Sequence, residues 1–281
     1  MAEKKCSPDL NEIEGFVRSL KMKISKNGEN VQIPEEKGSG AMGKVYQIGK
    51  SPCYYAAKVP KKNPKKPLAN QELLMIEGTL LKKIQNRCSE FFLCFTAAFI
   101  IDGEYWLVTE YINYPDLFDS IVNPDPVPIN AAAVKNLIDG LKALHDLDVA
   151  HLDIKPENIH YNPETNQIKY IDFGLACDQQ TCRGGSGTLK MVPPETFEIT
   201  TLEQAKKSDL WSLGVTIYLW LTGYEVEYDT RGGVNRGTLP GIITKYWEAR
   251  FNGFQKRINE AKLNINIRKL MIDRTLDCFQ S

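Results

Sequence analysis

The sequence predicts an α+β protein in which a small lobe of antiparallel strands with one main helix precedes a larger helical lobe. Strand-like alternation of apolar residues occupies 31–60 and 91–112, and the stretch between them carries a helical apolar stripe. After Asn113, helical patterns replace the strands. The chain of 281 residues also exceeds the usual size of one hydrophobic core, which favours two lobes. We therefore place the first lobe at 31–112 and the second at 113–281.

Residues 1–30 form an N-terminal extension with one short amphipathic helix. Between Asn11 and Leu20 the apolar residues fall on one helical face, and acidic residues occupy the first turn. That face carries Ile13, Phe16, Val17 and Leu20. We expect this helix to dock on the main body; a helix that binds a partner protein is the alternative.

The first lobe has its main helix at Gln71–Gln85, followed by two strands. The strands, Phe91–Ile101 and Tyr105–Ile112, are joined by the turn Asp102-Gly103. The helix carries a wide apolar stripe made of Leu73, Leu74, Ile76, Leu80, Leu81 and Ile84. The second lobe is expected to contain helices at Ala131–Leu147 and Ser208–Leu221, the latter apolar enough to be buried.

Composition excludes several classes of function. Lys+Arg and Asp+Glu both number 35, so net charge gives no sign of a nucleic-acid or membrane partner. The charged start lacks the apolar core of a signal peptide, and no apolar run is long enough to span a bilayer. The seven cysteines are odd in number and include no CxxC, which predicts neither a disulfide framework nor a zinc site. We expect a reducing compartment, the cytoplasm or nucleus of the cell or host cell.

A glycine-rich stretch runs from Gly38 to Val45. Gly38, Gly40 and Gly43 follow the spacing GxGxxG, which lets backbone N–H groups approach a phosphate chain that a Cβ would obstruct. Taken alone, a glycine-rich hairpin without a ligand explains the stretch equally well. The segment that follows is a strand rather than a helix, which argues against a dinucleotide-binding fold.

Lys58 lies inside the apolar strand Tyr55–Val59, where a cation is costly without an anionic partner. A lysine reaching solvent from an edge strand is the alternative. The following helix offers Glu72 and Glu77. We favour Glu77, because it interrupts the apolar stripe and can therefore face inward.

The stretch His151–Tyr161 combines a carboxylate, a cation and an amide. Asp153 is followed by Lys155 and Asn158, with a proline between them, and Asp172 comes 14 positions after the asparagine. Oxygen ligands such as Asn158 and Asp172 suit Mg²⁺. Asp172-Phe173-Gly174 alone is commonly a simple turn.

Two further motifs, Val192-Pro193-Pro194-Glu195 and Asp209-Leu210-Trp211-Ser212-Leu213-Gly214, complete a series in one order at mutually sensible spacings. With these motifs, the chain over roughly 31–277 resembles a eukaryotic-type serine/threonine protein kinase. The resemblance implies a bilobal protein-kinase fold and transfer of the γ-phosphate of ATP, with Mg²⁺, to Ser or Thr hydroxyls of protein substrates.

The same resemblance implies a role for individual residues. In the second lobe, Asp153 would orient the substrate hydroxyl and accept its proton, Lys155 would steady the γ-phosphate, and Asn158 and Asp172 would hold Mg²⁺. Lys58 would hold the α- and β-phosphates and pair with Glu77. The loop over the phosphates would be Gly38, Ser39, Gly40, Ala41, Met42, Gly43 and Val45. The base and ribose would be held near Ala56, Thr109, Glu110, Ile112, Asp116 and His160.

Substrate preference also follows from the resemblance. Lys155 and Thr188 match positions typical of kinases that act on Ser and Thr. Glu157 and Asp116 match acidic positions that favour basic residues before the target in some relatives, so a basic protein substrate is expected. His160 replaces the usual aliphatic residue under the adenine; it stacks on the base or points away.

Leu152 stands where most such kinases have an arginine that binds phosphate on the activation segment. A leucine cannot bind phosphate, so we expect activity without phosphorylation of that segment, Leu175–Val192. Thr181 and Ser186 are its candidate sites besides Thr188. Cys177 and Cys182 lie in the same segment and are expected to be inert thiols, with a redox switch as the alternative.

The C-terminal pattern of the family begins at Leu270 and stops at Ser281, so either the chain is truncated or the lineage is compact. Compact kinases of this kind occur in large DNA viruses, which suggests that origin. Unless Arg268 or Arg274 pairs with Glu195, this short end is expected to promote self-association. A pseudokinase that binds nucleotide as a scaffold and a small-molecule kinase are the alternatives.

Overall fold

The computed structural model describes residues 9–25, 36–39, 43–62, 68–122, 130–184, 187–188, 191–193, 196 and 198–222. The chain divides into two compact units. The first comprises Met1–Ser89 and Leu93–Asn113, and the second comprises Glu90–Phe92 and Tyr114–Ser281. The α+β class predicted from the sequence is confirmed, since one unit carries an antiparallel sheet and the other is mainly helical. No described helix is both long and apolar enough to cross a membrane.

The first unit is built on a five-stranded antiparallel sheet with the order β1-β2-β3-β5-β4. Asp102 and Gly103 both have positive φ, as a tight turn between β4 and β5 requires. The strands are β1 (Glu36–Ser39), β2 (Gly43–Lys50), β3 (Cys53–Pro60), β4 (Phe95–Ile101) and β5 (Glu104–Glu110). Residues 91–94, expected to begin a strand, instead end the short helix α3 (Cys88–Phe91) and lead into β4.

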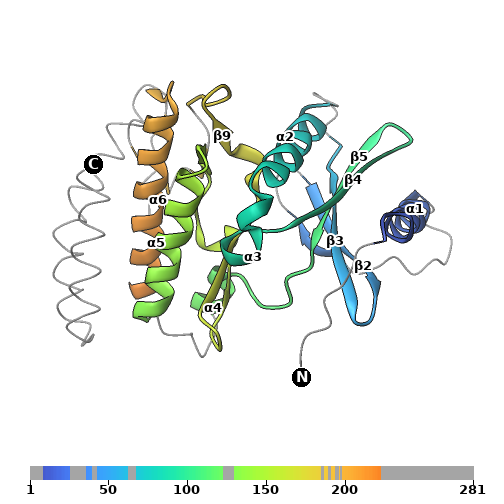
Figure 1. Ribbon diagram of the computed structural model, residues 1–281, viewed down its shortest axis with the longest axis horizontal. Helices are drawn as coiled ribbons and strands as arrows, with labels where there is room; N and C mark the ends of the chain where they lie inside the picture. The colour runs from blue at the N-terminus through green and yellow to red at the C-terminus, as the bar shows by residue number, and fades with distance from the viewer. Residues whose placement is uncertain are drawn as a thin grey trace, which may run out of the picture. The chain divides into compact units, whose positions relative to one another are not determined.

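Helix α1 (Leu10–Ser25) packs on this sheet, as predicted (Figure 1). Ile13, Val17 and Leu20 are buried in one apolar cluster with Trp106 of β5. Lys21 fixes the end of α1, because its ammonium donates to the carbonyl of Ile101 at 2.6 Å. The N-terminal helix is therefore part of the first unit and not a separate appendage.

Helix α2 (Ala69–Lys83) is the main helix of the first unit and contacts β3, β4 and β5. Most of the predicted apolar stripe is buried, including Leu74 and Leu81. Ile76 is an exception, because 41% of its surface is exposed. At Gly78 a Cβ would lie 2.3 Å from the Tyr105 hydroxyl, so glycine permits the close approach of α2 to β5.

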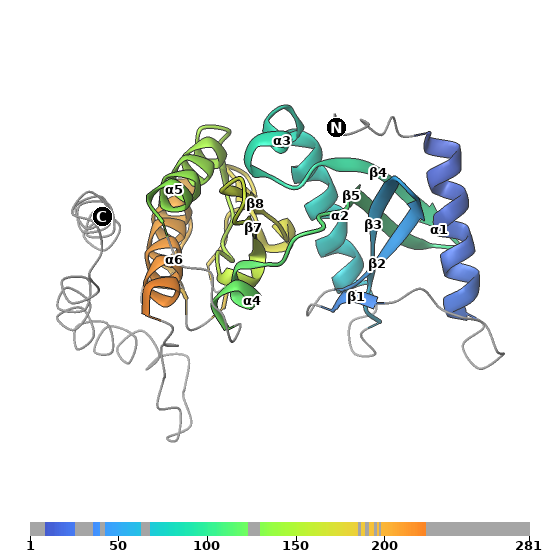
Figure 2. The ribbon, with the colours of Figure 1, turned by 90° about the horizontal axis from the view of Figure 1, so that it is seen from below.

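The second unit contains two long helices that lie side by side (Figure 2). Asn130 caps the first of them by accepting a hydrogen bond from the N–H of Ala133 at 2.9 Å. The helices are α4 (Leu117–Val122), α5 (Ala131–His145) and α6 (Leu202–Thr222). Helix α6 begins earlier than predicted, and its described middle part is buried, as expected.

Two small antiparallel ladders in this unit fix the loops that carry polar residues. Strand β6 (Val149–Ala150) pairs with β9 (Cys177–Asp178), and β7 (Ile159–Asn162) pairs with β8 (Gln167–Tyr170). The loop 151–158 leaves β6 and enters β7, and residues 171–176 connect β8 to β9. These ladders bring the two motif-bearing loops of the second unit together.

Candidate active site

The first unit contains the ion pair that the sequence predicted. Lys58 Nζ on β3 lies 2.8 Å from Glu77 Oε2 on α2. The lysine side chain is 14% exposed and the glutamate 2% exposed. Glu72, the alternative partner, lies on the exposed side of α2. Both charges are buried, so the desolvation cost of Lys58 is offset by a specific carboxylate partner.

The residues predicted to surround adenine lie on neighbouring strands. Ala56 faces Thr109 across the β3–β5 ladder, and Val45 faces Lys58 across the β2–β3 ladder. Thr109 is buried and donates to the carbonyl of Glu110 at 3.2 Å. The Glu110 carboxylate in turn accepts from the N–H of Cys94 at 2.8 Å, which anchors the end of β5 to the start of β4.

The glycine-rich stretch is described only in part. Gly38 and Ser39 belong to β1 and Gly43 begins β2, whereas Gly40, Ala41 and Met42 lie outside the described residues. A Cβ at Gly43 would lie 2.7 Å from the carbonyl oxygen of Val59, so this glycine allows β2 to approach β3 closely. Its structural role is therefore visible independently of any phosphate.

In the second unit, three polar side chains converge on one carboxylate. Asp153 is 7% exposed. Lys155 donates to its Oδ2 at 2.8 Å, and Asn158 Nδ2 donates to the same oxygen at 2.9 Å. Thr188 donates to Oδ1 at 2.8 Å and accepts from Lys155 at 3.0 Å. Thr188 thus contacts Asp153 directly, and the carboxylate is fixed in orientation by three donors.

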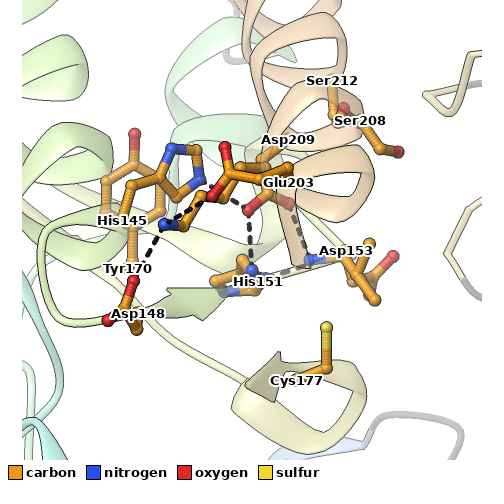
Figure 3. A network of polar contacts seen from close by, with 12 residues as sticks. His145, Asp148, His151, Asp153, Tyr170, Cys177, Glu203, Ser208, Asp209 and Ser212 are labelled. Carbon is orange, nitrogen blue, oxygen red and sulfur yellow. Dashed lines mark hydrogen bonds and ion pairs between the residues drawn. The ribbon is translucent and has the colours of Figure 1, made fainter. Parts of the chain in front are cut away.

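Asp209 of α6 holds the backbone of this loop (Figure 3). Its fully buried carboxylate accepts from the N–H of His151 and from the N–H of Leu152, both at 2.7 Å. His145 Nε2 lies 3.0 Å from the same carboxylate. Leu152 has a positive φ of 61°, which a leucine rarely adopts. The two charge-assisted hydrogen bonds offset that strain and set the direction in which the chain enters Asp153.

Asn158 and Asp172 are brought together by the backbone. The carbonyl of Asn158 accepts from the N–H of Ile171 at 2.9 Å, one residue before Asp172. Asn158 Nδ2 donates to the backbone carbonyl and to the carboxylate of Asp153, both at 2.9 Å. The amide oxygen of Asn158 and the Asp172 carboxylate are oxygen donors of the kind that Mg²⁺ prefers, so their predicted role as its ligands stays a prediction. The described part of the chain holds no cluster of three or more His, Cys, Asp or Glu residues set for a metal.

Phe173 connects this motif to the core of the unit. The centre of its ring lies 4.8 Å from the centre of the His151 ring and 6.2 Å from the centre of the Phe92 ring, which it meets edge-on. His151 also contacts the carbonyl of Ile171 through Nε2 at 2.9 Å. The loop that carries Asp153 and the loop that carries Asp172 are thus packed on each other through His151 and Phe173.

His160 and Asp116 pair in an isolated β-bridge near the start of α4. His160 Nδ1 donates to the carbonyl of Tyr114 at 2.7 Å, which fixes the ring against the segment that carries Asp116. Asp116 accepts from the N–H of Asp119 at 2.8 Å. Burial raises the pKa of the Asp116 carboxyl above its ordinary value, and this hydrogen bond only partly opposes the rise.

Two predictions about the cysteines are wrong. Cys88 is joined to Cys94 and Cys177 to Cys182 by disulfide bonds, and Cys53 is also disulfide-bonded. The sequence separations of 6 and 5 fall outside the CxxC pattern. The short helix α3 in the first pair and the turn after Asp178 in the second nevertheless give each pair a Cα–Cα distance of 4.8 Å, which a disulfide accommodates.

Several predicted contacts cannot be compared with the fold. Glu195, Arg268, Arg274, Ser186 and the rest of the C-terminal pattern lie outside the described residues. Ile112 and Glu157 are described, as a partly buried and an exposed residue respectively. Asp209 was recognised as part of a motif, but its role as anchor of the loop 151–153 was missed, since contacts between residues 57 and 58 positions apart leave no local signal.

Comparison with known proteins decides the family. A family model described as the protein kinase domain matches residues 32–256. The chain belongs to the protein kinase family. The kinase is 31% identical over 214 residues to myosin light chain kinase 2 of Oryctolagus cuniculus, covering 74% of this chain and 33% of that protein. It is 27% identical over 248 residues to the serine/threonine-protein kinase AtPK2/AtPK19 of Arabidopsis thaliana, covering 84% of this chain and 51% of that protein.

The kinase therefore spans only part of these relatives. A match to the titin homolog of Caenorhabditis elegans, 28% identical over 230 residues, covers 77% of this chain and 1% of that protein. The protein kinase domain matched in this chain, residues 32–256, contains Lys58, Glu77, Asp153, Asn158 and Asp172. The resemblance to eukaryotic-type serine/threonine kinases that the motifs predicted is confirmed.

Proposed function

We propose that this kinase transfers the γ-phosphate of ATP to Ser and Thr hydroxyls of protein substrates in a reaction that depends on Mg²⁺. The observation that carries the proposal is the arrangement around Asp153, whose two carboxylate oxygens are held by Thr188, Lys155 and Asn158. Phosphoryl transfer needs positioning and charge neutralisation more than covalent chemistry, and this site supplies fixed charges.

Each group in the second unit has a distinct task in this proposal. Asp153 binds the substrate hydroxyl and receives its proton, and Thr188 and Lys155 keep the carboxylate turned toward that hydroxyl. Lys155 also places a cation beside the transferred group. Asn158 and Asp172 would hold Mg²⁺, which when bound neutralises phosphate charge.

In the first unit, Lys58 is the residue that would contact the α- and β-phosphates. Its contact with the 2% exposed Glu77 keeps the ammonium in one position. Both residues of the pair, together with Asp153, Asn158 and Asp172, are retained, so the scaffold alternative without catalysis has no support.

Substrate preference is proposed to be basic. Glu157 is exposed directly after Pro156 in the loop that carries Asp153, and Asp116 lies on the β-bridge to His160 in the same unit. Carboxylates at these positions favour Lys or Arg near the target hydroxyl. Thr188 beside Lys155 supports an aliphatic hydroxyl as acceptor, because both residues match positions typical of kinases that act on Ser and Thr.

Activity is further proposed to be independent of phosphorylation of the activation segment. Leu152 is 5% exposed and packs in an apolar cluster with Ile199, Leu202 and Ala205. No phosphate could be received there without unfavourable desolvation of its charge. The packing of Leu152 thus takes the place of an arginine–phosphate contact.

Incubation with labelled ATP, Mg²⁺ and a basic protein such as protamine tests the proposed function. Label should appear on Ser or Thr, as shown by acid hydrolysis and phosphoamino-acid analysis, and the variant Asp153→Asn should abolish it. Equal labelling by both proteins would indicate a contaminant and contradict the proposal. Label on Tyr would contradict the assigned acceptor.

The remaining expectations stay predictions. These are the cytoplasmic or nuclear location, the absence of nucleic-acid and membrane partners, and self-association through the C-terminal part. The expected reducing compartment has lost its cysteine argument, because the described cysteines of the two pairs are joined.

A further inference from the structure

The disulfide Cys177–Cys182 lies between two parts of the proposed active site. Cys177 follows the Asp172-Phe173-Gly174 motif and is held in β9, where it faces Ala150 of β6. Cys182 precedes Thr188, whose hydroxyl binds Asp153. The disulfide therefore closes a loop within the chain segment that runs from the metal-binding carboxylate to the residue that orients the catalytic carboxylate.

The same disulfide packs against the loop that carries Asp153. Cys177 and Cys182 are 3% and 7% exposed and share one apolar cluster with Leu152 and Ala150. Leu152 is the residue immediately before Asp153, and its backbone N–H is bound by Asp209. The disulfide thus belongs to the apolar cluster on which the catalytic loop packs through Leu152.

A second contact joins the far end of the segment to the same leucine. At Gly187, with φ of +102°, a Cβ would lie 2.7 Å from the carbonyl oxygen of Leu152 and 2.6 Å from a methyl group of Val192. Gly187, the residue before Thr188, therefore lies very close to the backbone of Leu152.

Besides the pairing of Asp178 in β9, the described hydrogen bonds of the turn 178–182 are local, and those of its side chains are exposed. The N–H groups of Thr181 and Cys182 both donate to the carbonyl of Asp178 at 3.1 Å. The Thr181 hydroxyl donates to the Asp178 carboxylate at 2.9 Å in an exposed position. Because exposed hydrogen bonds of a short turn open readily, the covalent bond is the strongest constraint described for this turn.

We propose that Cys177–Cys182 is a thiol–disulfide exchange site that controls protein phosphorylation by this kinase. The bridged form holds Thr188 on Asp153 and is competent; the reduced form releases the turn and lowers the use of protein substrates. This inference rests on the proposed function. The disulfide would constrain the activation segment in a chain where Leu152 stands in place of a phosphate-binding arginine.

The chemistry is a two-electron exchange with a dithiol. One thiolate of the dithiol attacks a sulfur of the bridge and breaks the S–S bond, forming a mixed disulfide and a cysteine thiolate. The second thiol of the reagent displaces the other cysteine, so the reagent leaves as a cyclic disulfide and both cysteines end as thiols. An oxidised dithiol reverses the reaction. Gln179, Gln180 and Thr181 are exposed beside the buried bridge, so opening of this turn gives the reagent access.

The test uses the full chain, with dithiothreitol and its oxidised form as probes. Three proteins are compared: the wild type, Cys177→Ser/Cys182→Ser and the matched control Cys88→Ser/Cys94→Ser, which removes the disulfide of the first unit. Differential alkylation with mass spectrometry reads the state of each cysteine. The kinetic readouts are kcat/KM for protamine and KM for ATP, and hydrogen exchange of residues 177–188 is measured in parallel.

Reduction of the wild type should lower kcat/KM for protamine about tenfold, with KM for ATP little changed and faster exchange in 177–188. Reoxidation should restore both. The double variant at 177 and 182 should stay at the reduced level in either reagent, whereas the control variant should respond as the wild type does. If the double variant fails to fold, the reversible titration of the wild type decides alone.

Three results would overturn the proposal. They are complete reduction of Cys177 and Cys182 with unchanged kcat/KM and exchange, a persistent response in the 177/182 variant, and thiols that oxidised dithiothreitol cannot join. Failure of the proposed function is distinguishable, since the wild type would then transfer no phosphate in either state. Hydrogen exchange would still decide whether the bridge constrains the segment, and unchanged exchange on reduction would refute it.

Discussion

The hydroxyl of Thr188 donates a 2.8 Å hydrogen bond to Oδ1 of Asp153, and the same hydroxyl accepts a bond from Lys155. The bond to Oδ1 joins Thr188 to Asp153, which are 35 positions apart in the sequence. The carboxylate has a fixed orientation before any substrate is bound. The side chains of Thr188, Lys155 and Asn158 hold the carboxylate, and Asp209 of α6 holds the backbone of the loop that carries it.

Thr188→Ala should therefore slow phosphorylation without preventing folding. Loss of a hydrogen bond to a charged group costs about 1.5–3 kcal/mol, which corresponds to a fall in kcat of about 10- to 100-fold. Steady-state kinetics with a basic protein substrate measures it. Thr188→Ser keeps the hydroxyl and should recover most of the rate; equal rates for the Ala and Ser variants would contradict the role given to this bond.

The buried pair Lys58–Glu77 predicts a separation of stability from activity. Lys58→Met removes the cation beside the 2% exposed Glu77 carboxylate, which should lower the free energy of unfolding by about 3–5 kcal/mol. Adding Glu77→Leu removes the buried charge and should restore most of that stability. Denaturant titration reads stability, and neither variant should phosphorylate protein. A double variant no more stable than Lys58→Met would show that the pair is not what stabilises this region.

Asp209→Asn should weaken the anchor of the catalytic loop. An amide can accept from only one of the two N–H groups of His151 and Leu152, and its own NH₂ would then face the other donor. We expect a loss of unfolding free energy on the order of 2–3 kcal/mol and a reduced kcat. Asp148→Asn is the matched control, since that aspartate is 72% exposed and contacts Lys206 at 3.1 Å. Its expected effect is below about 1 kcal/mol. Equal losses in the two variants would argue against the anchor.

Removal of the candidate phosphorylation sites should leave activity intact. In Thr181→Ala/Ser186→Ala, most of the wild-type kcat should remain, because Leu152 is buried among apolar residues and offers no charge to a phosphate. Tryptic mass spectrometry of the wild type shows whether either site is modified. Loss of most activity in the double variant would mean that the segment does depend on phosphate.

Acidification should weaken the selection of basic substrates through Asp116. Its pKa is raised above the ordinary value of 3.8 by burial, so the carboxylate gains a proton at a higher pH than an exposed aspartate would. For stability, a raised folded pKa means that this group favours the folded state at low pH and that this contribution is lost as pH rises through the folded pKa. For substrate selection, protonation removes the negative charge that attracts a basic peptide, so the ratio of kcat/KM for a basic peptide to kcat/KM for a neutral one should fall as pH decreases toward that pKa. Asp116→Asn should show a lower ratio without that pH dependence.

The sequence predicted those features of the fold and site that have a local cause. Glu77 could be chosen over Glu72 because it interrupts an apolar stripe, and the structure buries it beside Lys58. The docking of α1 followed from the spacing of Ile13, Val17 and Leu20. The Asp102-Gly103 turn followed from residue types that tolerate positive φ.

Other features depend on distant segments and could not be read from the chain. Asp209 reaches His151 and Leu152 only after α6 packs beside β6. The bridge Cys177–Cys182 depends on the turn at Asp178, which no spacing rule covers. Ile76 shows the reverse case: its place in the apolar stripe predicted burial, but among the described residues no neighbouring element covers it fully.

The central claim is that Asp153 acts on the acceptor hydroxyl and not on the binding of nucleotide. In Asp153→Asn, the rate of label transfer from ATP to a basic protein and the dissociation constant of ATP with Mg²⁺ should be measured on the same preparation. The rate should fall about 10³-fold or more, while the dissociation constant changes less than about threefold. A variant that still transfers label at a rate near the wild type would contradict the account, as would one whose lost rate is explained entirely by weaker binding of ATP.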